Sequence, residues 1–92
     1  MANVISFKND TDVDADTHAV SFIAGYGCHC DHDGGTCSVE PVDQNANWDC
    51  WFTNDQSNAR MGSTVNVNVN HASKRVTLSA DNGNYNVKVT DL

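Results

Sequence analysis

The 92-residue chain is long enough for one small domain, and its formal net charge of −7 is concentrated in its first half. Residues 1–50 carry nine acidic side chains against a single lysine, whereas residues 51–92 carry three acidic and four basic side chains. Binding to nucleic acid or to anionic membrane requires a basic face, so this charge argues against both partners. No apolar run is long enough to cross a bilayer.

Residue usage predicts an all-β chain. Asparagine occurs twelve times, valine, threonine and serine are common, and the helix-forming residues leucine, glutamate and lysine are scarce. We therefore expect a single domain over residues 1–92, folded as a small antiparallel β-sandwich of six to seven short strands, with a small barrel as the alternative. A chain of this length buries only a marginal core, so disulfide bonds or a bound metal would add stability that it needs.

The first third of the chain is expected to hold two strands separated by an acidic loop. Residues 3–8 predict the first strand, and residues 18–26 predict a central strand with both faces covered. Between them, residues 9–17 carry aspartate at every second position. If this loop is extended, its carboxylates share one face, where their repulsion favours water or a cation between them.

The acidic loop is a candidate calcium site. An Asp-x-Asp-x-Asp run can supply three oxygen ligands, which here are Asp10, Asp12 and Asp14. The EF-hand pattern is not met, because Ala15 and Ser21 stand where that pattern requires glycine and glutamate. Asp31 and Asp33 of another loop would have to complete the site. The alternative is a solvated acidic loop without a metal.

All four cysteines lie within residues 28–50, at Cys28, Cys30, Cys37 and Cys50. We expect all four to form disulfide bonds, as in small secreted domains. Cys28 and Cys30 are too close to pair comfortably with each other. Two arrangements remain open: Cys28–Cys37 with Cys30–Cys50, or Cys28–Cys50 with Cys30–Cys37.

Two other uses of the cysteine segment compete with disulfide bonds. A zinc site could combine the thiolates with His29 and His32, although the C-x-C-x₆-C-x₁₂-C spacing lacks the usual paired knuckles. A nucleophilic cysteine working with His32 is a third possibility, but nothing in the spacing requires it.

Residues 48–53 predict a strand that turns Cys50 toward the core and Trp51 toward solvent. A partly exposed indole beside carboxylate and amide groups commonly holds a sugar ring, because the ring face stacks on the sugar and the polar groups bind hydroxyls. The candidate ligand-binding residues are Trp51, Asp49, Asn47, Asn54 and Tyr26. The alternative is that Trp51 packs in a second core layer or in an oligomer interface.

The last third predicts a three-stranded meander. Residues 64–70 alternate strictly between valine and polar residues, as a half-buried strand does. Asn82-Gly83 is a strong hairpin sequence, and a two-residue turn there pairs Leu78 with Val87. A second turn near residues 72–73 would pair Val67 with Leu78 on the same buried face.

Together these features favour a small secreted binding protein. We expect a lectin-like domain that recognises carbohydrate or a cell-surface glycan in a defence, toxicity or recognition role, without a cofactor unless calcium binds, and with a homodimer as one way to cover the indole. A signal peptide is not evident, so secretion is inferred from the cysteines. The alternatives are a calcium- or zinc-binding domain and a small secreted effector or inhibitor that binds a host protein. Catalysis ranks last, because no nucleophile or acid–base pair can be placed.

Overall fold

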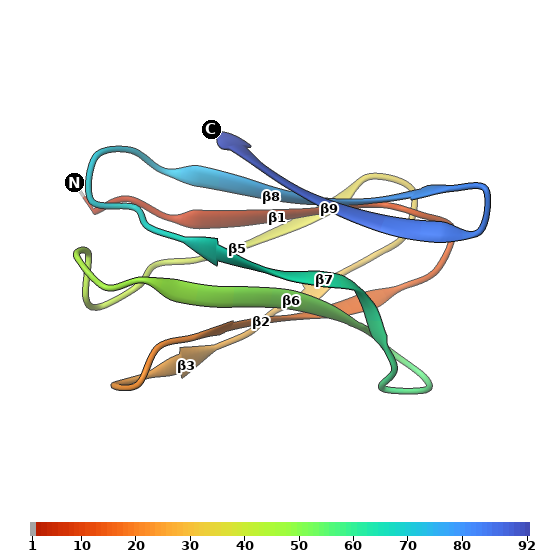
Figure 1. Ribbon diagram of the computed structural model, residues 1–92, viewed down its shortest axis with the longest axis horizontal. Coiled ribbons are helices and arrows are strands. Elements are labelled where there is room, and N and C mark those ends of the chain that lie inside the picture. Colours follow the sequence, from red (N-terminus) through yellow and green to blue (C-terminus); the bar gives the residue numbers. More distant parts are fainter. Residues whose placement is uncertain (1) are drawn as a thin grey trace.

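The computed structural model describes residues 2–92 as two β-sheets packed face to face, as Figure 1 shows. The strands are β1 (Ile5–Asp10), β2 (Ala15–Val20), β3 (Gly25–Tyr26), β4 (His29–Cys30), β5 (Gly35–Val39), β6 (Trp48–Asn54), β7 (Arg60–Val67), β8 (Lys74–Asp81) and β9 (Asn84–Asp91). The β1 sheet has the order β5-β1-β8-β9, and the β2 sheet has the order β3-β2-β6-β7, with β4 also paired to β2. The predicted β-sandwich is confirmed. Residues 2–92 contain no helix capable of crossing a membrane.

Alternating side chains from both sheets form the core. Along β6, Trp48, Cys50 and Phe52 are fully buried, as the alternation of residues 48–53 predicts. Phe7 of β1 meets Phe52 edge to face across the sandwich, with ring centroids 5.7 Å apart. Burial of each large apolar side chain contributes about 1.5–3 kcal/mol, so these inward positions fix which face of each sheet lies inside.

The hairpin of β8 and β9 has the predicted register. Leu78 pairs with Val87, and the turn is made by Asn82 and Gly83, which both have positive φ (51° and 81°). Positive φ at both central positions is what a type I′ turn requires, and it explains why this dipeptide closes the hairpin.

The prediction that the strand within residues 64–70 pairs with β8 to complete a three-stranded meander is wrong. β7 pairs antiparallel with β6, opposite Trp48 at Val67, and belongs to the β2 sheet, whereas β8 pairs in parallel with β1. The segment after β7 crosses from one sheet to the other instead of turning back as a hairpin. Val67 is buried in either arrangement, so its alternation predicts an inward face but not which strand lies beside it.

The predicted strand over residues 18–26 is two strands. The chain reverses at residues 21–24, where the Ser21 amide donates to the Ala24 carbonyl at 2.8 Å, and β3 then pairs with β2. Phe22 lies at the tip of this hairpin and is 99 % exposed. The apolar run therefore does not reflect two covered faces, because its middle forms a solvent-exposed turn.

One disulfide bond forms, between Cys28 and Cys37, which one of the two predicted arrangements contains. The prediction that all four cysteines pair is wrong, because Cys30 and Cys50 are free and buried. Cys30 pairs opposite Ala15 of β2 and Cys50 opposite Ala19. Four residues of strand span about 13 Å, whereas the two Cα atoms of a disulfide lie within about 7 Å. In the alternative zinc site, which combines the thiolates with His29 and His32, Cys28 and Cys37 could not serve as ligands while the disulfide bond joins them.

Candidate functional site

The acidic loop and the cysteine segment, which are separate candidates in the sequence, meet at one edge of the β2 sheet. β4 pairs with the start of β2, which places His29 directly opposite Asp16. The loop after β6 contributes Asp55, whose amide donates to the Asp14 carbonyl at 3.2 Å. Three segments of the chain therefore converge here, and we call Asp14, Asp16, His29, Asp31, His32 and Asp55 the His–Asp cluster.

His29 is the centre of this cluster. Its Nδ1 lies 2.9 Å from Asp16 Oδ1 and 3.8 Å from Asp55 Oδ1, and its Nε2 lies 3.3 Å from Asp31 Oδ1. The hydrogen bond with Asp16 raises the pKa of His29 above its ordinary value of 6.5, and the negative charges of Asp55 and Asp31 act in the same direction. The imidazole thus has acidic groups at both of its ring nitrogens.

His32 forms a second pair beside the first. Its Nδ1 lies 2.6 Å from Asp14 Oδ1, and its backbone amide donates to the same oxygen at 2.9 Å. These hydrogen bonds lower the pKa of Asp14, and the side-chain bond raises the pKa of His32. Asp14 also borders a cavity of about 240 Å³ that reaches Asn54 and Asp55 in the loop after β6.

Two sets of side chains in the cluster lie close enough together to share a metal ion. In each set, one ligand atom from each of three residues lies within 4.8 Å of the others; the sets are Asp14, His29 and Asp31, and Asp16, His29 and Asp55. His29 is common to both. Mixed imidazole and carboxylate ligands suit zinc and other first-row divalent ions, whereas calcium prefers oxygen ligands alone.

Of the three aspartates predicted to bind a metal, the structure brings only Asp14 to this cluster. Asp10 Oδ1 lies 3.7 Å from Lys8 Nζ, and the side chain of Asp12 is exposed. Neither belongs to a potential metal set among residues 2–92. The chain bends at residues 11–13, after β1, so the acidic loop is not extended from Asp10 to Asp14.

Trp51 points outward as predicted, but neighbouring side chains contact its indole ring. It is half-buried on the outer face of β6, opposite the side that carries Cys50. His18 of β2 stacks on the indole with centroids 5.0 Å apart and an interplanar angle of 12°. The Arg60 guanidinium of β7 lies 4.6 Å from the ring centroid. Because β2 and β7 flank β6 on opposite sides, the indole is enclosed by neighbours from both strands.

The other predicted ligand-binding residues have partners other than Trp51, although Asp49 shares the outer face of β6 with it. Asp49 and Asn47 accept hydrogen bonds from Asn66 and Asn68, at 3.1 and 3.0 Å respectively. Asn54 accepts two backbone hydrogen bonds inside its own loop. Tyr26 pairs opposite the buried Ala19 and packs on Trp48, with centroids 5.5 Å apart, so it lies on the other face of the sheet from Trp51.

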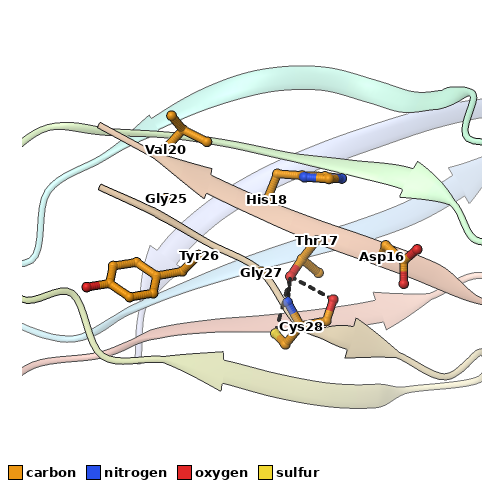
Figure 2. A pocket seen from close by; sticks show the side chains of 8 residues that line it. All are labelled: Asp16, Thr17, His18, Val20, Gly25, Tyr26, Gly27 and Cys28. Carbon is orange, nitrogen blue, oxygen red and sulfur yellow. Dashed lines mark hydrogen bonds between the residues drawn. The ribbon is translucent and has the colours of Figure 1, made fainter. Parts of the chain in front are cut away.

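A groove of about 570 Å³ runs along the outer side of β2 and β3 (Figure 2). Its lining includes Asp16, His18 and Val20 from β2, opposite glycines in β3 and the segment after it. Gly27 must lack a side chain, because a Cβ there would lie 2.5 Å from the Thr17 carbonyl oxygen. Asp16 belongs to both the groove and the His–Asp cluster, so the two features are continuous.

His18 and Asp55 were not predicted as site residues, whereas Asp16 belongs to the predicted acidic loop but not to its three predicted ligands. The alternation of β2 and β6 could have placed His18 beside Trp51 once those strands were paired. No local pattern marks Asp55, which lies in a polar loop and reaches His29 only through the fold. Comparison with protein-family models, with curated proteins and with solved structures finds no match.

Proposed function

We propose that this chain is a small metal-binding β-domain that holds a divalent transition-metal ion, such as zinc, in the His–Asp cluster. The supporting observation is that His29 lies among three carboxylates contributed by three separate segments. His29 offers two alternative ligand sets, one with Asp16 and Asp55 beside its Nδ1 and one with Asp14 and Asp31, of which Asp31 lies beside its Nε2. One ion would occupy one of these sets, because the two ring nitrogens point in different directions.

The charge balance of the cluster supports a cation. Asp14, Asp16, Asp31 and Asp55 have only histidines as cationic partners within 4.0 Å among residues 2–92. When both histidines are protonated, their two positive charges balance only two of the four carboxylate charges. When both are neutral, they balance none. A bound divalent ion removes this repulsion and uses the imidazoles in their neutral form.

We further propose that the domain works outside the cell, where its disulfide bond persists. A metal would then tie together β2, β4 and the loop after β6, which meet only at this edge. The role would be stabilisation of a binding surface or capture of the ion itself.

Calorimetric titration of chelator-treated protein with zinc, manganese and calcium chlorides tests the proposal. We expect one zinc or manganese ion per chain, weaker calcium binding, and at least about tenfold weaker binding in His29→Asn. His71→Asn is the matched control, because His71 is exposed in a turn away from the cluster. Absence of binding, or equal loss in the two variants, would contradict the proposal.

Carbohydrate binding remains a second candidate, now supported by the groove rather than by a free indole. His18 both lines the groove and stacks on Trp51, so the two form a continuous aromatic surface beside Asp16. A glycan array with the wild type and Trp51→Ala tests it, and loss of a glycan signal with the fold retained is the expected result. If the array shows no binding, this candidate falls and the metal proposal is unaffected.

A further inference from the structure

The three cysteines nearest the groove form a cluster that the metal site does not use. Cys28 and Cys37 are joined by the disulfide bond, which links the β2 sheet to β5 of the other sheet. The Sγ atom of the free Cys30 lies 3.2 Å from Cys37 Sγ. Cys30 therefore holds a thiol in contact with one sulfur of an existing disulfide.

We propose that Cys30 exchanges with this disulfide and thereby makes the partly exposed Cys28 a site of covalent modification. The Cys30 sulfur loses its proton and attacks Cys37 Sγ, which forms the Cys30–Cys37 bond and breaks the Cys28–Cys37 bond. The bonding electron pair leaves on Cys28 Sγ, which takes up a proton. One disulfide is replaced by another, so no external oxidant or reductant is needed.

The surroundings favour release of Cys28 rather than of Cys37. The Thr17 hydroxyl donates its one proton to the Cys28 carbonyl oxygen at 3.1 Å and lies 3.2 Å from Cys28 Sγ, so a rotation of the O–H bond would turn that proton to the leaving thiolate. It lies 4.0 Å from Cys37 Sγ. Figure 2 shows Thr17 beside Cys28 at the wall of the groove. Cys28 is partly exposed, whereas Cys30 is fully buried.

Burial of Cys30 has two consequences. External reagents do not reach its sulfur in the folded protein, so a reagent added to native protein reacts at Cys28 only after exchange. The buried thiolate is also disfavoured, so we expect exchange on the minutes-to-hours timescale of uncatalysed disulfide rearrangement. The class of modifying agent is a small electrophile or a small-molecule disulfide, because Cys28 is only partly exposed.

Maleimide labelling of the native, unreduced protein tests the exchange. After acid quenching, cleavage before aspartate cuts the backbone between the peptide Asp16–Cys30 and the peptide that contains Cys37, so that only a disulfide bond still joins them. Fragmentation across His29 then shows whether Cys28 or Cys30 carries the label. We expect a slowly growing single adduct on Cys28 together with a Cys30–Cys37 bond.

Two variants serve as matched controls. Cys30→Ala should abolish labelling of Cys28, and Cys50→Ala, which removes the other buried thiol, should leave it unchanged. Thr17→Val should slow the labelling, because it removes the hydroxyl beside the leaving sulfur. Unlabelled Cys28 after a day in native wild-type protein, or Cys28 labelling that persists in Cys30→Ala, would overturn the proposal.

Discussion

The β8–β9 hairpin and the edge where β2 meets β4 are built in opposite ways. The hairpin pairs residues that are close in sequence, through a two-residue turn at Asn82 and Gly83. The β2–β4 edge pairs Asp16 with His29 and brings Asp55 to both from the far end of β6. One region is organised by local backbone preferences, and the other by contacts between distant segments.

This difference explains why the potentially reactive and metal-binding side chains lie at the β2–β4 edge. The hairpin presents solvated polar side chains such as Thr77 and Lys88 on its outer face and apolar ones inside. The β2–β4 edge holds the His–Asp cluster, the groove and the three neighbouring sulfurs. Side chains from several segments can converge only where the chain returns repeatedly to one place.

The largest expected effect comes from a charge placed where the two sheets meet. Val67→Asp should unfold the domain, because Val67 is 1 % exposed and a lone buried carboxylate costs several kcal/mol. Thr64→Asp lies on the same strand but is exposed near Arg60, so it should be tolerated. Chemical denaturation measures both. Equal stability of the two variants would mean that the inward face of β7 is wrongly assigned.

Gly62→Ala should have the next largest effect. Gly62 has φ of +81°, and a Cβ there would lie 2.7 Å from Val87 Cγ2 of the facing sheet. We expect a loss of about 2–3 kcal/mol in the free energy of unfolding. Gly25→Ala is the control, because its Cβ would meet Val20 at 3.8 Å and its backbone is not strained. Similar melting temperatures for both variants would show that the sheets are not in close contact at β7.

The same contrast separates the features that the sequence predicts from those that it does not. Alternation predicts the inward Cys50, the outward Trp51 and the register of Leu78 with Val87, because each depends on neighbours along one strand or one turn. Alternation does not predict that β7 pairs with β6 instead of β8, because the inward side chain of Val67 can pack against any apolar partner. The convergence of His29 with Asp55 has no local signature either, since it depends on strand order.

A smaller effect is expected from pH in metal-free protein. The folded-state pKa values of His29 and His32 are raised, so their stabilising contribution is full below about pH 6.5, their ordinary pKa, and is lost as pH rises through the raised values. The pKa of Asp14 is lowered, so its contribution is full above its ordinary value and is lost as pH falls through the lowered one. With chelator present, the melting temperature should therefore decline from pH 6 toward pH 8.

Controls separate this effect from general charge repulsion. The decline should shrink in His29→Asn and in His32→Asn and persist in His71→Asn. Added zinc should reverse the slope, because metal binding requires neutral imidazole and is favoured as pH rises. A melting temperature that rises with pH in metal-free wild type would show that these two histidines do not stabilise the fold by the ion pairs described.

Nuclear magnetic resonance of the histidine rings during zinc titration tests the metal site most directly. The chain has four histidines, and among residues 2–92 only His29 lies within 4.0 Å of three carboxylates. We predict that the ring nitrogens of His29 shift first and saturate at one zinc per chain, that His32 responds through Asp14, and that His71 does not move. An unchanged His29 ring at saturating zinc, or equal shifts of all four rings, would contradict a metal site at the β2–β4 edge.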